Sequence, residues 1–341
     1  MKKIGVLGAG TWGIALAQML SCSGHSVQVW SALPQEIDAL SATRVHPNLP
    51  GVTLQDEITY TKDISAVCEG KDILLFAVPS PFVRATARAA KPYVAKHQVI
   101  VDVAKGIEAD TLMTMSQIIT QEIGNPQIKV VALSGPTHAE EVSRDLPTTI
   151  VSACEDPAAA QLVQKVFTSH CMRVYTNDDV HGVELCGALK NVIALACGIA
   201  TGYGCGDNAR AALITRGIAE MARLGAAMGC REQTFGGLAG IGDLIVTATS
   251  MHSRNNRCGI LLGKGVPVGE ATKQIGMVVE GLNALPAALR LAQHYDVEMP
   301  IVETVDAVVS GKMSVAEAVH QLMTRGQKSE LRRSSFDNRY D

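Results

Sequence analysis

The stretch Gly8-Ala9-Gly10-Thr11-Trp12-Gly13 decides the fold of the first half of this 341-residue chain. It follows the apolar segment Lys3–Leu7 and opens a segment with helical spacing, Thr11–Ser23. In this context Gly8 permits a tight turn, Gly10 lets the backbone approach a pyrophosphate, and Gly13 allows close helix–strand packing. The start of the helix also favours negative charge. The stretch therefore predicts a dinucleotide-binding loop, and the alternative is a tight turn without a ligand.

Short runs rich in Val, Ile and Leu continue the pattern along the first half of the chain. Helical stretches separate these runs, which is typical of a parallel sheet covered on both faces. We therefore expect an α/β fold, with a Rossmann-type, doubly wound, mostly parallel sheet. The expected strands after Lys3–Leu7 are Val27–Trp30, Ile73–Val78, Val99–Val103, Lys129–Leu133, Thr148–Ser152 and Met172–Tyr175.

The pattern becomes helical from about Asp178 almost to the end of the chain. This change predicts a dinucleotide-binding domain over residues 1–178 and an all-helical substrate and catalytic domain over residues 179–330. Residues 331–341 are charged and polar, and we expect them to form a mobile tail.

Composition excludes several classes of protein. Lys and Arg number 30 against 33 Asp and Glu, which gives a net charge of −3, so no basic excess exists for general nucleic-acid binding. The nine cysteines form no C-x-x-C pair, and no His, Cys and Asp cluster has the spacing of metal ligands. Reduced thiols in a cytoplasmic enzyme without a metal are the simplest interpretation.

The N-terminal apolar segment is not a membrane anchor, because glycines and polar residues interrupt it before Leu20. No other apolar run approaches membrane-spanning length, so we expect a soluble protein with no membrane span. The low charged fraction of 18% and the long helical segment favour a homodimer.

The segment Trp30-Ser31-Ala32 stands where an NAD-specific site carries an acid for the ribose hydroxyls. The first acid, Glu36, falls inside the next predicted helix. Nothing in the segment itself repels a 2′-phosphate, and no arginine is placed to bind one. We therefore expect both NAD and NADP to be used, and the alternative role for Ser31 is that of a turn residue.

Lys190 is surrounded by apolar residues in the segment Cys186–Leu195. Burial of an ammonium group is unfavourable, and it commonly lowers the pKa or requires a partner. A lysine in such a place is suited to general acid–base catalysis near neutral pH. The alternative is a lysine that extends from the helix surface to water.

Three further stretches suggest the same site. Lys105 follows an expected strand, and Ser134-Gly135-Pro136-Thr137 ends the next long strand, so both lie where ligands of α/β sheets bind. Asp243 ends a Gly240-Ile241-Gly242 run, and Arg254 lies among small polar residues that suit a phosphate or carboxylate. The alternatives are a solvated Lys105, a helix-capping Asp243 and a surface patch at Arg254 and Arg257.

These residues resemble the bacterial type of NAD(P)-dependent glycerol-3-phosphate dehydrogenase from Lys3 to about Lys328. The resemblance rests on ordered blocks along the whole chain. The blocks are Ser134–Thr137, Leu189–Val192, Asn208–Gly217, Gly240–Leu244, Ser253–Asn255 and Val278–Gly281.

The resemblance implies that Lys190 exchanges the proton at the C2 oxygen of the substrate. It implies hydride transfer between NAD(P)H and dihydroxyacetone phosphate, giving sn-glycerol 3-phosphate for phospholipid synthesis. The implied substrate contacts are Lys105, Gly135, Thr137, Lys190, Asp243, Ser253, Arg254 and Asn255. The implied cofactor contacts, with those of the glycine loop (Gly8, Gly10, Gly13) and Ser31, are Thr11, Trp12, Lys105, Ala139, Arg254, Val278 and Glu280. The chain departs from the family at Ser31-Ala32, where a glycine and a basic residue are often found.

Two alternatives remain at this point. One is a hydroxy-acid dehydrogenase of similar two-domain plan, which would lack the Ser253–Asn255 group. The other is a non-catalytic NAD(P)-binding sensor, against which the presence of Lys105, Lys190 and Asp243 together counts.

Overall fold

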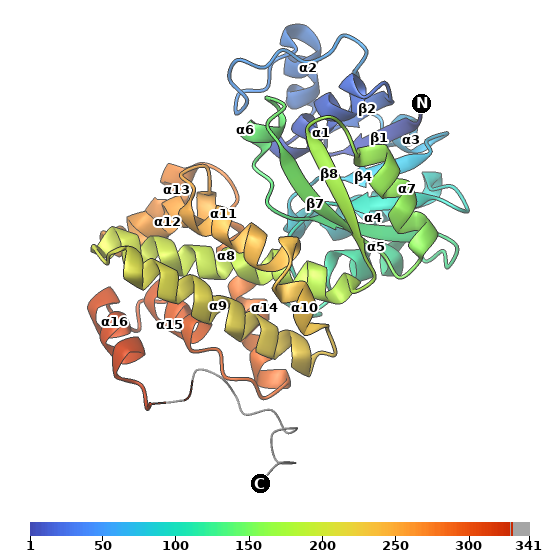
Figure 1. Cartoon of the computed structure of the whole chain (residues 1–341). Helices are drawn as coiled ribbons and strands as arrows, with labels where there is room; N and C mark the ends of the chain where they lie inside the picture. The colour runs from blue at the N-terminus through green and yellow to red at the C-terminus, as the bar shows by residue number, and fades with distance from the viewer. Residues whose placement is uncertain (328, 330–341) are drawn as a thin grey trace.

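The structure, a computed structural model, describes residues 1–327 and 329. Figure 1 shows a sheet-containing half in blue and green beside a helical half in yellow to red. The expected tail, residues 331–341, lies outside the described residues, so its mobility stays a prediction.

The first half contains an eight-stranded sheet with the order β3-β2-β1-β4-β5-β6-β7-β8. All neighbouring strands are parallel except β6 and β7, so the predicted mostly parallel sheet is confirmed. In this register Leu7 lies opposite both Trp30 and Phe76, which brings the ends of three strands to one edge. The strands are β1 (Lys3–Leu7), β2 (Ser26–Trp30), β3 (Thr59–Thr61), β4 (Ile73–Phe76), β5 (Val99–Asp102), β6 (Lys129–Ser134), β7 (Thr148–Ala153) and β8 (Met172–Asn177).

Strand β3 is the one strand that the sequence did not reveal, because Thr-Tyr-Thr is too short and too polar to give an apolar run. The other strands bury alternate side chains on two faces of the sheet. Ile73 and Leu75 of β4 join one apolar cluster, whereas Leu74 and Phe76 join another. Helices cover both clusters: α1 (Thr11–Cys22), α2 (Pro34–Thr43), α3 (Ile64–Cys68), α4 (Val83–Ala90), α5 (Met115–Ile123), α6 (Ala139–Val142) and α7 (Pro157–Phe167), with short 3₁₀ turns at Ser80–Phe82 and Lys91–Tyr93.

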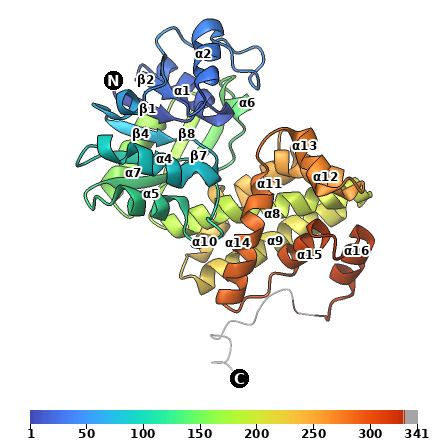
Figure 2. The same ribbon diagram turned by 180° about the vertical axis from the view of Figure 1, so that it is seen from behind.

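The helical half is built around α8 (Val180–Tyr203), which runs through the middle of the surrounding helices (Figures 1 and 2). The described helices around it are α9 (Asp207–Ala227), α10 (Glu232–Phe235), the π-helical turn η3 (Leu238–Gly242), α11 (Asp243–Thr249), α12 (Arg254–Gly263), α13 (Val268–Ile275), α14 (Glu280–His294), α15 (Pro300–Val309) and α16 (Val315–Thr324). This arrangement confirms the predicted all-helical half.

Helix α8 also corrects one expectation. By length and composition it could cross a membrane, so the statement that no run approaches spanning length is wrong. The whole of its apolar window is buried inside the protein, however, as in the core helix of a soluble protein. A helix was expected here, but its membrane-spanning length was not, because Glu184, Lys190 and several glycines interrupt its apolar residues.

Glycines set the close contact between α8 and α12. A Cβ at Gly198 of α8 would lie 2.2 Å from the carbonyl oxygen of Asn256, and one at Gly259 of α12 would lie 2.3 Å from that of Leu195. Only glycine permits backbones to approach in this way. The contact fixes the start of α12, and with it Arg254, against the helix that carries Lys190.

Candidate active site

The glycine loop lies between β1 and α1, as predicted. Gly8 has a φ of +125°, and a Cβ there would lie 2.7 Å from the backbone of Ala77. A Cβ at Gly13 would lie 2.3 Å from the carbonyl oxygen of Gly8, whereas one at Gly10 would meet no protein atom within 4 Å. Gly8 and Gly13 are therefore required by the fold, and Gly10 leaves open space beside the loop.

The N-terminus of α1 faces this open space. No side chain caps the helix at Gly10, and its first turn holds no acidic residue. Unpaired N–H groups at such an end bind phosphate, and a negative side chain there would oppose it. The loop therefore fits the pyrophosphate of a dinucleotide.

Two lysines and one aspartate meet at the border between the two halves of the molecule. We call Lys105, Lys190 and Asp243 the lysine cluster. Lys190 Nζ of α8 donates to Asp243 Oδ1 at 2.7 Å, and Lys105 Nζ, just after β5, donates to Asp243 Oδ2 at 2.6 Å. Lys190 is 5% exposed and Asp243 is 1% exposed. The three alternatives, namely a lysine extending to water, a solvated Lys105 and a helix-capping Asp243, are therefore wrong.

The remaining hydrogen bonds distinguish the two lysines. Lys105 Nζ also donates to the Gly135 carbonyl at 2.9 Å and to Thr137 Oγ1 at 3.1 Å, so all three of its protons are used. Lys190 Nζ donates in addition only to Thr247 Oγ1 at 2.5 Å, whose own proton goes to the Asp243 carbonyl. One N–H of Lys190 therefore remains available for a substrate atom.

Burial and neighbouring charges together set the pKa values of Lys190 and Asp243. Burial, together with the charges of Lys105 and Arg254, lowers the pKa of Lys190 to about 8 against the opposing effect of Asp243. Burial by itself would raise the pKa of Asp243, but the two ammonium groups outweigh burial and hold this pKa below its usual value. Asp243 is therefore a carboxylate, and Lys190 can gain and lose a proton near neutral pH.

Two ammonium groups around one carboxylate leave an excess positive charge. Arg254, the first residue of α12, adds another charge that acts on Lys190. Burial lowers the pKa of Arg254, while Glu280 and Glu140 nearby raise it. Within residues 1–327 and 329 the guanidinium forms no hydrogen bond, so its donors are available for an anion. The exposed position of Arg257 fits a surface residue, but the half-buried position of Arg254 does not.

The neighbours of Arg254 have structural partners. Ser253 caps α12, because its hydroxyl accepts the N–H of Asn256 at 3.2 Å. Asn255 joins three helices: its Nδ2 donates to Asn191 Oδ1 at 2.8 Å, and its Oδ1 accepts the N–H of Gly281 at 2.8 Å. Of these two implied substrate contacts, Asn255 has its amide oxygen and one N–H already engaged, and Ser253 keeps its proton.

The implied cofactor contacts come from several elements of the two halves. Thr11 begins α1 next to Trp12, and Thr11 Oγ1 accepts a hydrogen bond from Asn48 at 3.2 Å. Ala139 begins α6, and Val278 lies in the loop before α14.

Glu280, the last implied cofactor contact, joins the two halves of the molecule. Its carboxylate accepts the N–H of Ser80 at 3.1 Å and the Ser80 hydroxyl at 2.6 Å, just after β4. Ser31 directly follows β2, and its hydroxyl donates to Glu36 at 2.5 Å. Glu36 lies inside α2, as expected from the sequence, but its carboxylate reaches back to Ser31.

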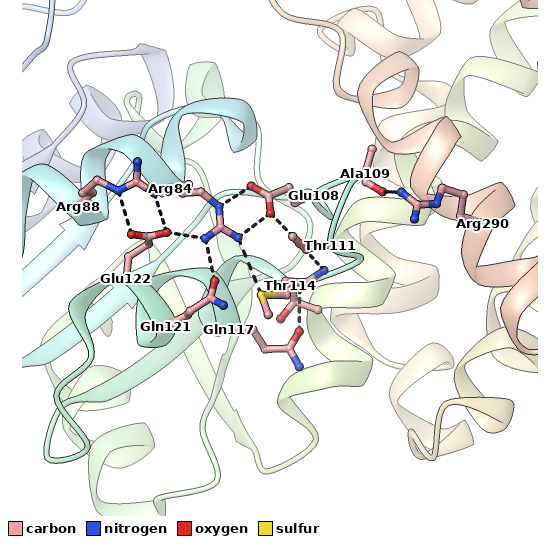
Figure 3. Close-up of polar contacts among 11 residues, drawn as sticks. Arg84, Arg88, Glu108, Ala109, Thr111, Thr114, Gln117, Gln121, Glu122 and Arg290 are labelled. Carbon is pink, nitrogen blue, oxygen red and sulfur yellow. Dashed lines mark hydrogen bonds and ion pairs between the residues drawn. The ribbon is translucent and has the colours of Figure 1, made fainter.

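The loop that follows Lys105 is fixed from both halves of the molecule. Arg84 of α4 forms a two-pronged contact with Glu108, at 2.7 and 2.6 Å, and also contacts Glu122 (Figure 3). From the opposite side, Arg290 of α14 donates to the Ala109 carbonyl (Figure 3). These contacts restrain the backbone beyond Lys105 and keep its ammonium group at Asp243.

Two polar side chains of the site, Thr247 and His138, were not expected from the sequence, and Ser134 was expected only as part of the stretch Ser134–Thr137. Thr247 lies one helical turn after Asp243, a spacing that could have revealed it. Ser134 Oγ and His138 Nε2 are buried and have no hydrogen-bond partner within the described residues. Burial and the charge of Lys190 lower the pKa of His138. Unpaired buried atoms of this kind are suited to a ligand.

A metal-ligand group also appears outside this site. Asp145, His170 and Cys171 place ligand-type atoms within 4.8 Å of one another, although their spacing in the sequence did not indicate it. Asp145 and His170 are exposed, and the carboxylate oxygen and the imidazole nitrogen lie 3.6 Å apart. None of the three forms a hydrogen bond with the lysine cluster.

Comparisons with known proteins agree with this geometry. The family profile described as NAD-dependent glycerol-3-phosphate dehydrogenase N-terminus matches residues 3–160, and the C-terminus profile matches residues 179–320. The chain is 63% identical over 335 residues to glycerol-3-phosphate dehydrogenase [NAD(P)+] 2 of Lactobacillus delbrueckii subsp. bulgaricus, covering 97% of this chain and 99% of that protein. It is 47% identical to the Bacillus subtilis enzyme, covering 97% and 96%.

A solved structure shows the same fold. The glycerol-3-phosphate dehydrogenase of Coxiella burnetii is 37% identical and superimposes with a TM-score of 0.91, covering 95% of this chain and 99% of that chain. Both halves of the molecule are included in these matches. The chain therefore belongs to the family of NAD(P)-dependent glycerol-3-phosphate dehydrogenases.

Proposed function

We propose that the lysine cluster catalyses the interconversion of dihydroxyacetone phosphate and sn-glycerol 3-phosphate with NAD(P)H. The observation that carries the proposal is the largely buried triad of Lys105, Asp243 and Lys190, together with Arg254, whose charge acts on Lys190 and whose guanidinium has no hydrogen bond within the described residues. An acid–base lysine suits a carbonyl and its alcohol, and the excess positive charge suits a phosphate ester.

In the proposed reduction, Lys190 gives a proton to the C2 oxygen. The reduced nicotinamide supplies the hydride when it is bound. The available N–H of Lys190 lies toward the substrate, while Asp243 and Thr247 hold its other two protons. Asp243 stays ionised throughout and stabilises the ammonium form between turnovers. In the reverse direction, the neutral amine of Lys190 takes the proton from the alcohol.

Lys105 has a different proposed role. Because its three protons are bound to Asp243, Gly135 and Thr137, it acts as a fixed positive charge that stabilises the developing oxyanion. Direct contact with the substrate would require Lys105 to exchange one of these partners.

Arg254 holds the phosphate of the substrate in this proposal, because guanidinium groups bind phosphate oxygens in pairs. Binding energy from the phosphate, remote from the reacting carbon, would position the carbonyl at Lys190. The hydroxyl of Ser253 can donate to the same anion, since it only accepts at the start of α12.

The proposal extends to the domain boundaries, the location, the oligomeric state and the metabolic role of the protein. We infer a cofactor domain over residues 1–178 and a substrate domain over 179–330, because β8 ends at Asn177 and α8 begins at Val180. Nine unpaired cysteines support a cytoplasmic location. The long helical half supports a homodimer, and the product would serve phospholipid synthesis.

The deciding experiment is turnover of dihydroxyacetone phosphate, measured with NADH and NADPH side by side. We expect oxidation of the reduced cofactor that depends on this substrate. Pyruvate and other small keto acids serve as controls for the hydroxy-acid dehydrogenase alternative, and equal or faster reaction with them would contradict the proposal. Dinucleotide binding without any turnover would favour the non-catalytic sensor.

A further inference from the structure

The carboxylate of Glu36, from helix α2, lies next to the end of β2, although no acidic residue directly follows β2 in the sequence. Ser31 is buried there, and its hydroxyl donates to Glu36 Oε2 at 2.5 Å while accepting the N–H of Leu33 at 3.1 Å. Glu36 lies in the first turn of α2, yet its side chain turns back to the strand. In dinucleotide-binding sheets, the residue at this position contacts the adenosine ribose.

The glycine loop adjoins the same position. The N–H of Gly8 donates to the Trp30 carbonyl at 2.9 Å, which joins the loop to the end of β2. His46 is buried behind the loop, hydrogen-bonds to the backbone of Ala9, and feels the charge of Glu36, which raises its pKa against the larger effect of burial. The carboxylate of Glu36 therefore lies at the rim of the dinucleotide cradle.

The charge of Glu36 is not neutralised by a neighbouring base. Among the residues that the structure describes, Glu36 forms no ion pair with Lys or Arg. By contrast, Asp38 of the same helix pairs with Lys62 at 2.6 Å. Ala32, the exposed residue next to Ser31, offers no positive charge for a 2′-phosphate.

We infer that Glu36 selects the cofactor: its carboxylate accepts hydrogen bonds from the 2′- and 3′-hydroxyls of NAD(H) and repels the 2′-phosphate of NADP(H). Ser31 is a positioning residue, because its hydroxyl holds the carboxylate at the end of β2. This inference rests on the proposed function, and it turns the expectation that both cofactors are used into a preference for NADH.

The test measures dissociation constants of NADH and NADPH from nicotinamide fluorescence, without substrate. The parent protein should bind NADH about tenfold more tightly than NADPH or better, the scale of a hydrogen bond to a charged group. Glu36→Gln keeps an acceptor for Ser31 but removes the charge, so the ratio should fall toward one. Ser31→Ala should reduce the ratio less.

Asp38→Asn is the matched control, since it removes one negative charge from the same helix at a residue paired with Lys62. It should leave the ratio of the two dissociation constants unchanged. Equal or tighter binding of NADPH by the parent would overturn the inference. So would an equal change of the ratio in Glu36→Gln and Asp38→Asn, because only the net charge would then matter.

Binding without substrate separates this inference from the proposed function. A Glu36-dependent preference for NADH in a protein that does not reduce dihydroxyacetone phosphate would support the inference and reject the reaction. Failure to bind either dinucleotide would overturn both.

Discussion

The glycine loop of the sheet half and the lysine cluster of the helical half recognise negative charge by different means. Around Gly8–Gly13 the recognition comes from backbone N–H groups and from space that side chains would fill. Around Asp243 it comes from buried ammonium groups whose desolvation is offset by one carboxylate. The glycine loop can only bind an anion, whereas the lysine cluster can also gain and lose a proton.

This difference predicts which substitutions affect binding and which affect the chemical step. A methyl group in the loop displaces the cofactor without altering any pKa. A lost charge at the second site instead removes the proton donor, the oxyanion stabiliser or the phosphate contact.

Substitution of Lys190 by Ala should lower kcat by about a hundredfold to ten-thousandfold, the scale of a positioned acid–base group. The dissociation constant of NADH should stay nearly constant, because the glycine loop belongs to the other half. Steady-state kinetics and cofactor fluorescence measure the two effects, and circular dichroism checks the fold. Near-normal kcat in a folded variant would exclude Lys190 from the proton transfer.

Substitution of Arg254 by Ala should cost about 2–4 kcal/mol of transition-state stabilisation with dihydroxyacetone phosphate, as when one partner of a charged hydrogen-bonded pair is removed. With dihydroxyacetone, which lacks the phosphate, kcat/KM should be very low in the parent and no lower in the variant. Arg257→Ala on the same helix, at an exposed residue, is the control and should have little effect.

Equal losses on both substrates would assign Arg254 to the cofactor or to the fold instead. The phosphate would then be held by another group, and the Ser253 hydroxyl would be the next residue to vary.

Substitution of Gly10 by Ala should raise the dissociation constant of NADH about tenfold while leaving stability unchanged. A Cβ at Gly10 meets no protein atom within 4 Å, so a loss of affinity reports contact with the cofactor. Gly13→Ala should instead destabilise the fold by about 1–3 kcal/mol, because its Cβ would overlap the Gly8 carbonyl.

Thermal unfolding and cofactor titration separate these two effects. Gly269→Ala, another glycine with open space around its Cβ position, should leave the affinity for NADH unchanged. Unaltered NADH affinity in Gly10→Ala would place the pyrophosphate elsewhere.

The smallest predicted effect is on the pH dependence. Because the pKa of Lys190 is about 8, kcat/KM for reduction should fall above that pH as the ammonium is lost, and kcat/KM for oxidation should rise through it. Asp243→Asn removes the charge that opposes the effect of burial, so the residual activity should show this limb at lower pH. A limb that moves to higher pH, or does not move, would contradict the assignment to Lys190.

Local sequence determined the parts of this protein that depend on neighbours in the chain. The strand–loop–helix context of Gly8–Gly13 and the apolar β-strands are set by local sterics and by burial on both faces of a sheet. The apolar neighbours of Lys190 likewise predicted a desolvated ammonium group, and the ordered blocks of sequence indicated the family.

The tertiary structure alone decided which polar atoms meet. Asp243 binds two lysines that come from distant segments, and the three protons of Lys105 are all engaged because β5, β6 and α11 converge. Asn255 is drawn into a bridge between helices, and Glu36 turns back to Ser31. Spacing in the sequence could not give these contacts, because the direction of a long side chain depends on the packing of segments far apart in the chain.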